Sequence, residues 1–234
     1  MKNEITNLIK SKDLNELTIE MIESIIDNHT VDEMIKEVPI IKSIVVIKNL
    51  WTSFSDRIFI KKALRTLLEL KDVNWKDRID FITELKEKGV SGSEKLLMII
   101  DKLDTIEKSE IFGKLCRLRA LKKIKRFEFL TLSNLIQNAF LPYLRLHTYF
   151  SNEYTSNDSI TIKKIDPNPL LLMGIIEKKP YTHTELRDSK ERDFEYRDEI
   201  IKYKYIYSRL GLLLAEHSHY LLGVGVIKTK PNNL

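Results

Sequence analysis

The strongest candidate for binding chemistry is a run of basic residues between positions 114 and 126. It contains no acidic residue, and its cations are Lys114, Arg117, Arg119, Lys122, Lys123, Lys125 and Arg126. Such a concentration could neutralise the phosphates of DNA or RNA, with counterions released at each contact. A structural interpretation stands beside it, because a helix dipole favours cations at its C-terminus and residues 122–126 are expected to connect two helices. Both interpretations stay open at the level of sequence.

Motifs that hold nucleotides or metal ions are absent from the sequence. The 7 glycines form neither GxGxxG nor GxxxxGK[ST], and residues 223–225 (Gly-Val-Gly) are not followed by a helical pattern that could cradle a phosphate. His217 and His219 are two positions apart, which directs them to different sides of a helix, and Cys116 has no CxxC partner. The sequence therefore predicts no cofactor and no metal ion.

Nucleophilic catalysis would need a serine or cysteine with a general base in reach. No GxSxG occurs, and Cys116 falls on the inward side of its expected helix, where a thiol packs as a small hydrophobic group. Asp101 and Asp104 lie in a lysine-containing stretch that is typical of a solvated helix face. We therefore expect a protein that is not an enzyme.

Composition narrows the class of protein further. The chain has 234 residues, 43% of them hydrophobic, which suits one large domain or a medium domain with an appendage. A net charge of +5 permits an anionic partner but is also a common level for solubility. One cysteine, and an N-terminus with acidic residues and no apolar block, favour a cytoplasmic location. The most apolar stretch, residues 38–51, carries lysines and is too short to span a bilayer, so membrane attachment is not expected.

Apolar residues recur at helical spacing from residue 2 to about residue 150. The expected caps and ends of the middle helices are Ser55-Asp56, Asn74 with Gly89, and Ser91 with Glu94. A further helix is expected from about Glu107, and the last run, residues 127–150, contains Pro142, which should kink or divide it. Short connections between these helices favour antiparallel neighbours, and hence a helical bundle.

The segment from residue 40 to about residue 53 is apolar nearly all round, and Pro39 suits its first turn. One interpretation is a central helix that the bundle buries on every side. The other is a face reserved for another protein or a second copy of the chain, with aromatic side chains as anchors. The residues of that candidate protein interface are Ile40, Ile44, Ile47, Trp51 and Phe54.

The pattern changes after residue 150. A polar, linker-like run precedes residues 160–165, whose alternating isoleucines fit a short strand. A turn signal at 166–169 is expected to start a short helix through Leu172. Two strands are then expected, at 173–178 and 202–207, separated by a charged stretch, and Ser208 is expected to cap a helix over 209–220.

The segment LLMGIIEKK, a variable insert and then YKYIYSRLGLLLAEH resemble the closing half of a winged-helix domain. The resemblance covers roughly the last third of the chain and implies a strand, a wing, a returning strand and a capped helix. Residues 166–172 stand where the recognition helix would be and carry no basic residue. The resemblance therefore implies docking or dimerisation rather than the reading of an operator sequence.

The middle of the chain, from PIIKSIVVIKNLW to LSNLIQNAFL, resembles uncharacterised helical proteins of bacterial genomes and prophages. Its layout is also similar to that of some abortive-infection-associated proteins. The resemblance implies a context of phage, prophage or antiviral defence and brings no catalytic residue with it.

The sequence thus predicts a mainly α fold, with a multi-helix bundle over residues 1–150 and a small α+β, winged-helix-like module over 151–234. The leading functional hypothesis is a non-enzymatic protein-interaction protein of phages or mobile elements, acting in defence or counter-defence. Its partner would be another protein or a second copy of the chain. The alternative is a DNA- or RNA-binding regulator that uses residues 114–126 and the C-terminal wing.

Overall fold

The computed structural model describes four stretches of the chain: residues 2–26, 53–145, 166–187 and 196–223. These residues pack as two compact units, Met1–Asn138 and Ala139–Leu234. The domain boundary predicted at residue 150 lies outside the described stretches and stays a prediction. The predicted strand at 160–165 and residues 40–52 of the apolar segment also lie outside the described residues.

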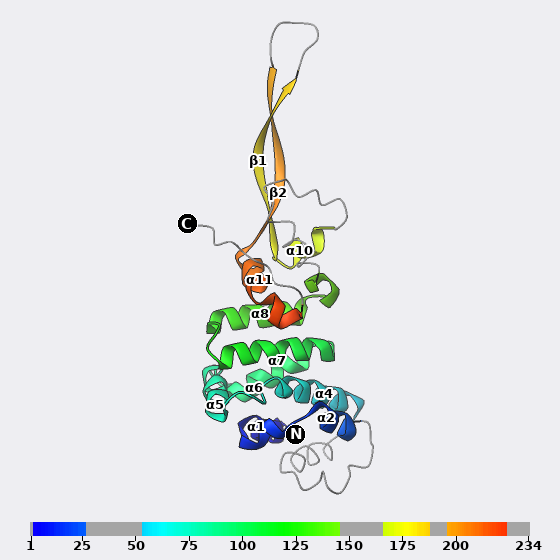
Figure 1. The fold of residues 1–234 in the computed structure, drawn as a ribbon, viewed down its shortest axis with the longest axis vertical. Helices are drawn as coiled ribbons and strands as arrows, with labels where there is room; N and C mark the ends of the chain where they lie inside the picture. Colours follow the sequence, from blue (N-terminus) through cyan, green and yellow to red (C-terminus); the bar gives the residue numbers. More distant parts are fainter. Residues whose placement is uncertain (1, 27–52, 146–165, 188–195, 224–234) are drawn as a thin grey trace. The chain divides into compact units, whose positions relative to one another are not determined.

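In its described residues, the first unit contains helices and one isolated β-bridge (Figure 1). Its elements are α1 (Lys2–Lys10), the short 3-10 helix η1 (Lys12–Glu16), α2 (Ile19–Ile26), α4 (Phe54–Leu68), α5 (Trp75–Glu84), α6 (Gly92–Lys102), α7 (Ile106–Ala120) and α8 (Arg126–Asn138). Helix α7 packs between α4 and α8, while α1 and α2 cover the opposite side of α4, α5 and α6. The unit is therefore a multi-helix bundle, as the helical spacing predicts.

Side chains that accept from backbone N–H groups fix where the helices begin. Asn74 caps α5 and Ser91 caps α6, as predicted, each through a backbone N–H in the first turn. Helix α4 is capped by Ser53 instead of Ser55, in a reciprocal capping box with Asp56. Ser53 is the cap because a spacing of three residues lets its side chain and that of Asp56 each reach a backbone N–H.

The predicted end of α5 at Gly89 is wrong. Helix α5 ends at Glu84, and Gly89 lies in the following turn with φ of 81°, a left-handed conformation that suits glycine. The turn closes through two hydrogen bonds between Glu87 and Val90. The helix stops early because the chain must turn before Gly92, where α6 begins against the carbonyl of Ile82.

The core of the bundle is aliphatic with three aromatic rings at its centre. Phe81 of α5 and Phe129 of α8 meet edge to face, with ring centroids 5.5 Å apart, and Phe112 of α7 lies 6.0 Å from Phe129. These rings hold three helices together, since edge-to-face pairs add to the free energy gained from burial alone. Cys116 is also fully buried, and burial raises the pKa of its thiol well above the usual value.

The helical run predicted over 127–150 is divided, as Pro142 predicts. Helix α8 ends at Asn138, residues 139–140 are not helical, and residues 141–145 are helical again. Pro142 stands in the first turn of this second piece, where its missing N–H leaves no hydrogen bond unmade.

The second unit contains α10 (Asn168–Leu172), strands β1 (Ile176–Arg187) and β2 (Tyr196–Tyr207), and α11 (Arg209–Leu222). The strands form a two-stranded antiparallel ribbon that pairs continuously from Ile176 with Tyr207 to Arg187 with Tyr196. The predicted strands at 173–178 and 202–207 were too short. Main-chain pairing continues through most of the charged stretch, because it does not require alternating apolar residues.

The start of α11 is tied to the chain before β1. Ser208 caps α11, as predicted, by accepting from the N–H of Gly211, and its hydroxyl donates to the carbonyl of Gly174. Its own N–H donates to the carbonyl of Ile175 at 3.0 Å. A Cβ at Gly211 would overlap that same carbonyl, so glycine permits the close approach. The order short helix, hairpin and capped helix confirms the predicted small α+β module.

Candidate interaction surface

The basic segment spans the last part of α7, the turn after it and the first residue of α8. The turn is a Schellman motif: Lys122 N–H donates to Arg119 O and Lys123 N–H donates to Leu118 O, both at 2.9 Å. Lys122 takes the left-handed position with φ of 57°, and no other non-glycine residue in the described stretches has a positive φ. Glycine or asparagine is usual at this position, because a Cβ there costs about 1 kcal/mol.

Two of the predicted anion-binding residues face α4 and the loop after it. Lys114 pairs with Glu110 one turn earlier at 2.9 Å, and Arg117 pairs with Asp72 at 3.2 Å. These cations also lie near Glu69, whose pKa is raised by its burial despite the opposing effect of Lys114. Lys114 is therefore paired with a carboxylate of its own helix and Arg117 with one from the loop after α4, and the binding of an anion by these two residues stays a prediction.

Two further arginines of the segment attach the turn to the end of α5. Arg119 pairs with the carboxylate of Glu84, and Arg126 donates through Nε to the backbone carbonyl of the same residue at 3.1 Å. Arg119 also donates to Ile124 O at 3.3 Å, which braces the turn from inside. These contacts attach the turn to α5, and each arginine has an acidic side chain beside it.

Three lysines remain exposed in the turn: Lys122, Lys123 and Lys125. None of their ammonium groups meets a carboxylate in the described part of the chain. Two exposed apolar side chains flank them, Leu121 with 41% of its surface exposed and Phe127 with 69%. These five residues, Leu121, Lys122, Lys123, Lys125 and Phe127, are named the turn surface below.

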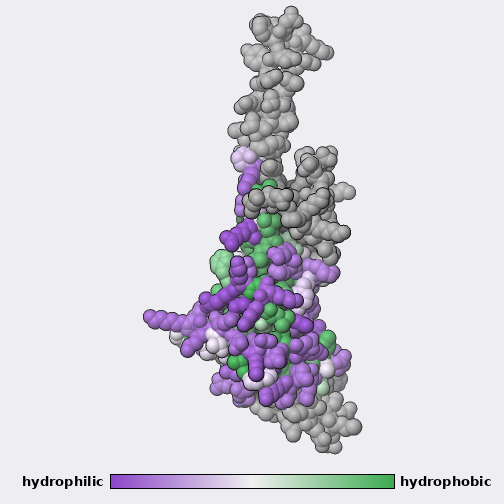
Figure 2. All heavy atoms as spheres, turned by 60° about the vertical axis from the view of Figure 1, so that its left-hand side comes forward, coloured by the Kyte–Doolittle hydropathy of each residue, from purple (hydrophilic) through white to green (hydrophobic). Residues whose placement is uncertain are grey.

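The apolar part of the turn surface was missed by the sequence prediction. The sequence analysis did not single out Leu121 or Phe127; the structure exposes both, while Ile124 between them is buried. Most of the coloured residues in Figure 2 are hydrophilic, with hydrophobic residues showing between them. An exposed phenylalanine beside three lysines gives a candidate partner both an apolar and an electrostatic contact.

The other predicted interface falls mostly outside the described residues, which exclude Ile40, Ile44, Ile47 and Trp51. Its last member, Phe54, is the first residue of α4 and is 75% exposed. Ile58, one turn later on the same helix, is partly exposed as well. Phe54 thus stays a candidate anchor on the residues that can be described.

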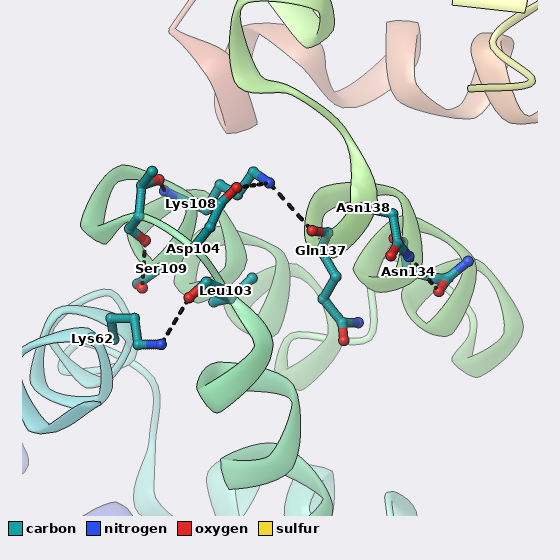
Figure 3. Close-up of polar contacts among 9 residues, drawn as sticks. Lys62, Leu103, Asp104, Lys108, Ser109, Asn134, Gln137 and Asn138 are labelled. Atoms are coloured by element: carbon teal, nitrogen blue, oxygen red, sulfur yellow. Dashed lines mark hydrogen bonds and ion pairs between the residues drawn. The ribbon is translucent and has the colours of Figure 1, made fainter. Parts of the chain in front are cut away.

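Two lysines that the sequence analysis did not single out, Lys62 and Lys108, are buried in the bundle and form polar contacts there (Figure 3). Lys62 of α4 donates to the carbonyls of Asp101 at 2.8 Å and Leu103 at 2.7 Å, at the end of α6. Burial lowers the pKa of Lys62, although Asp101 and Asp104 oppose this effect. Lys108 lies between the Asp104 carboxylate, 2.9 Å away, and Gln137 O at the end of α8, 3.2 Å away.

These buried lysines have a structural role. Each ammonium group satisfies carbonyls that a helix end leaves without a partner, and positive charge is favoured there by the helix dipole. The signal in the sequence was their position: Lys62 falls on the inward stripe of α4 with Phe59 and Thr66. No cluster of three or more histidine, cysteine or acidic side chains that could hold a metal ion occurs within the described stretches.

None of the described helices is long and apolar enough to cross a membrane. Comparison of the chain with models of protein families, with curated proteins and with solved structures found no match.

Proposed function

We propose that this protein acts without catalysis, by binding another protein through the turn surface at the α7–α8 connection. The observation that carries the proposal is the combination at one turn of three exposed lysines without carboxylate partners in the described residues and two exposed apolar side chains. The partner we propose presents carboxylates around an apolar pocket that accepts Phe127. Aromatic anchors in pockets contribute most of the affinity of typical protein interfaces, and complementary charges speed association.

The conformation of Lys122 supports the proposal. A lysine in the left-handed position of a Schellman motif costs folding free energy that a glycine would not. A residue kept at such a position against that cost is expected to do something that glycine cannot, and here it adds an ammonium group at the apex of the turn. The braces from Arg119 and Arg126 also support it, because a turn that is held in place loses less entropy on binding.

A photo-crosslinking experiment tests the proposal in the cell that produces the protein. Phe127 is replaced by a benzophenone-bearing phenylalanine analogue, and in a matched control the analogue replaces Met98, which is exposed on α6. The proposal requires a discrete protein adduct from position 127 that is absent from position 98. Adducts of equal pattern at both positions, or none at 127, would reject the turn surface.

The second candidate function is the binding of single-stranded nucleic acid. An exposed aromatic ring beside lysines is the arrangement on which bases stack while phosphates are neutralised. Pairing of Lys114, Arg117, Arg119 and Arg126 with acidic residues weighs against it, since three lysines make a small phosphate-binding surface. If it holds, log affinity for a mixed oligonucleotide should fall with log salt at a slope of about −2, from three phosphate contacts. A salt-independent or undetectable interaction removes this candidate.

The biological context rests on resemblance, not on the fold. The likeness of the middle segment to helical proteins of bacterial genomes and prophages supports a role in phage defence or counter-defence, in the cytoplasm. Self-association is a further proposal, and it would use the face around Phe54 rather than the turn surface, because three lysines repel their own copies. Light scattering on a Phe54→Ser variant beside the natural chain tests it: the variant should show the smaller mass.

A further inference from the structure

A cavity of about 330 Å³ lies at the N-terminus of α5, apart from the turn surface. Its walls come from η1 and from the loop that joins α4 to α5, and its charged residues are Lys12, Lys71, Asp72 and Arg78. The volume is at the lower end of the range for pockets that hold small molecules. Three cations against one carboxylate give the lining a net positive charge.

Arg78 is the unusual residue of this cavity. Its side chain is only 1% exposed, and no carboxylate in the described residues pairs with it. Its guanidinium donates to Leu70 O at 3.4 Å and to Ser11 O, while the buried Nε has no partner. Burial lowers the pKa of Arg78. A buried charge without a counterion is costly, and an anion in the cavity would lower that cost.

The two carbonyls that accept from Arg78 belong to opposite walls. Ser11 directly precedes Lys12, and Leu70 directly precedes Lys71, so the arginine holds together the two segments that carry the lysines of the cavity. This bridging explains why a guanidinium lies there. It does not account for the Nε donor, which the carbonyls leave unsatisfied.

The N-terminus of α5 adds to the positive potential of the cavity. Helix α5 has 10 residues and begins with Trp75, and Asn74 caps it by accepting from Lys76 N at 2.9 Å. Both Asn74 and Trp75 line the cavity, so the positive end of the helix dipole faces it. The ammonium of Lys12 lies 5.1 Å from the centroid of the Trp75 ring. A cation and an aromatic ring are therefore neighbours in the lining of the cavity.

Two acidic groups of this region, Asp72 and Glu20, have other partners. Asp72 accepts from Arg117 at 3.2 Å, and Glu20 of α2 has its pKa lowered chiefly by hydrogen bonds to its own backbone and to Thr18, with a smaller effect from Lys71. Neither supplies a counterion to the buried guanidinium.

We infer that this cavity binds the phosphate group of a small phosphorylated compound. The phosphate lies between Lys12, Lys71 and Arg78 at the N-terminus of α5, and Trp75 contacts the organic part. A monoester dianion matches a site with three cations and one engaged carboxylate. The cavity is larger than a bare phosphate needs, which favours a phosphorylated metabolite over the free ion.

Fluorescence of Trp75 measures binding directly. The full chain contains two tryptophans, so Trp51→Phe is introduced first to leave Trp75 as the reporter. The probes are inorganic phosphate, adenosine monophosphate and adenosine, titrated at constant ionic strength. Adenosine monophosphate should change the fluorescence and raise the melting temperature at lower concentration than phosphate, and adenosine should do neither. If phosphate and the monophosphate act equally, the organic contact is wrong. If neither acts up to about 10 mM, there is no phosphate site.

Single substitutions of lysines test whether the monophosphate binds in this cavity. Lys71→Met and Lys12→Met should each weaken binding of the monophosphate about tenfold, the loss of one charge-assisted contact. The matched control, Lys86→Met, removes an exposed cation just beyond the other end of α5 that does not line the cavity, and it should change affinity less than about twofold. Arg78 is left unchanged, because its replacement would also remove the hydrogen bonds that join the two walls of the cavity. Equal affinity of the Lys12, Lys71 and Lys86 variants would overturn the proposal while leaving the turn surface untouched.

Discussion

Arg119, in the last turn of α7, pairs with Glu84, the last residue of α5, across 35 positions of sequence. The pair, together with the bond from Arg126 to the Glu84 carbonyl, anchors the α7–α8 turn to the bundle. Two cations of the basic segment, Arg119 and Arg126, thus hold the turn that carries the exposed lysines. The turn surface owes its fixed shape to this anchor.

Glu84→Gln should loosen the turn. It leaves Arg119, whose side chain is 12% exposed, without its counter-charge, and we expect the free energy of unfolding to fall by about 1 to 2 kcal/mol. Hydrogen exchange of the Lys122 and Lys123 amides should accelerate, since these donate within the anchored turn. The control is Asp80→Asn, an exposed carboxylate on the same helix. Unchanged exchange in the Glu84 variant would show that the pair does not hold the turn.

Lys122→Gly should raise the stability of the protein and weaken its binding to the partner. Glycine relieves the left-handed strain, so chemical denaturation should show a gain of about 1 kcal/mol, while binding to the crosslinked partner weakens. Lys123→Gly is the matched control, because Lys123 has no positive φ and its replacement offers no such gain. A stabilised Lys122 variant with full binding would mean that this lysine is not used by the partner.

Gly92→Ala should be among the most destabilising single substitutions in the bundle. An added Cβ would overlap the carbonyl oxygen of Ile82, so α6 would have to move away from α5. We expect a loss of about 3 kcal/mol or more, although alanine has the higher helix propensity. Thermal unfolding checks this, with Met98→Ala on the exposed side of α6 as the control. Similar melting temperatures for both variants would contradict the close packing of α5 and α6.

Glu69 should make stability depend on pH. Burial raises its pKa in the folded chain above the ordinary value of 4.5, so the folded state binds the proton more tightly than the unfolded state. Its contribution to the free energy of unfolding is therefore most favourable at low pH and decreases as pH rises from 4.5 through the raised pKa. Glu69→Gln should flatten that part of the stability profile. A profile that is unchanged in the variant would mean that another carboxylate is responsible.

Much of the fold could be predicted because its signals are local. Asn74, Ser91 and Ser208 each cap the helix that the sequence assigns to them, and Pro142 divides the helical run as its missing N–H requires. A cap acts over three residues, so the pattern contains all the information needed. The cap of α4 was misplaced by two positions although Ser53 and Asp56 carried the correct spacing.

The candidate sites depend on contacts between distant residues, which spacing does not encode. The segment 114–126 contains no acidic residue, yet the fold brings Asp72, Glu84 and Glu87 to it from other elements. In the same way, no pattern in the sequence singles out Arg78. Only the packing of η1 against the α4–α5 loop shows that it is buried without a counterion.

The central claim, binding of a protein through the turn surface, is tested most directly by charge reversal in the crosslinking experiment. Lys122, Lys123 and Lys125 are changed to Glu together in the chain that carries the crosslinker at position 127. A control chain carries the same three changes at Lys10, Lys61 and Lys102, on other helices. We expect the protein adduct to disappear in the first chain and to persist in the second. An adduct of equal yield in both chains would contradict the claim.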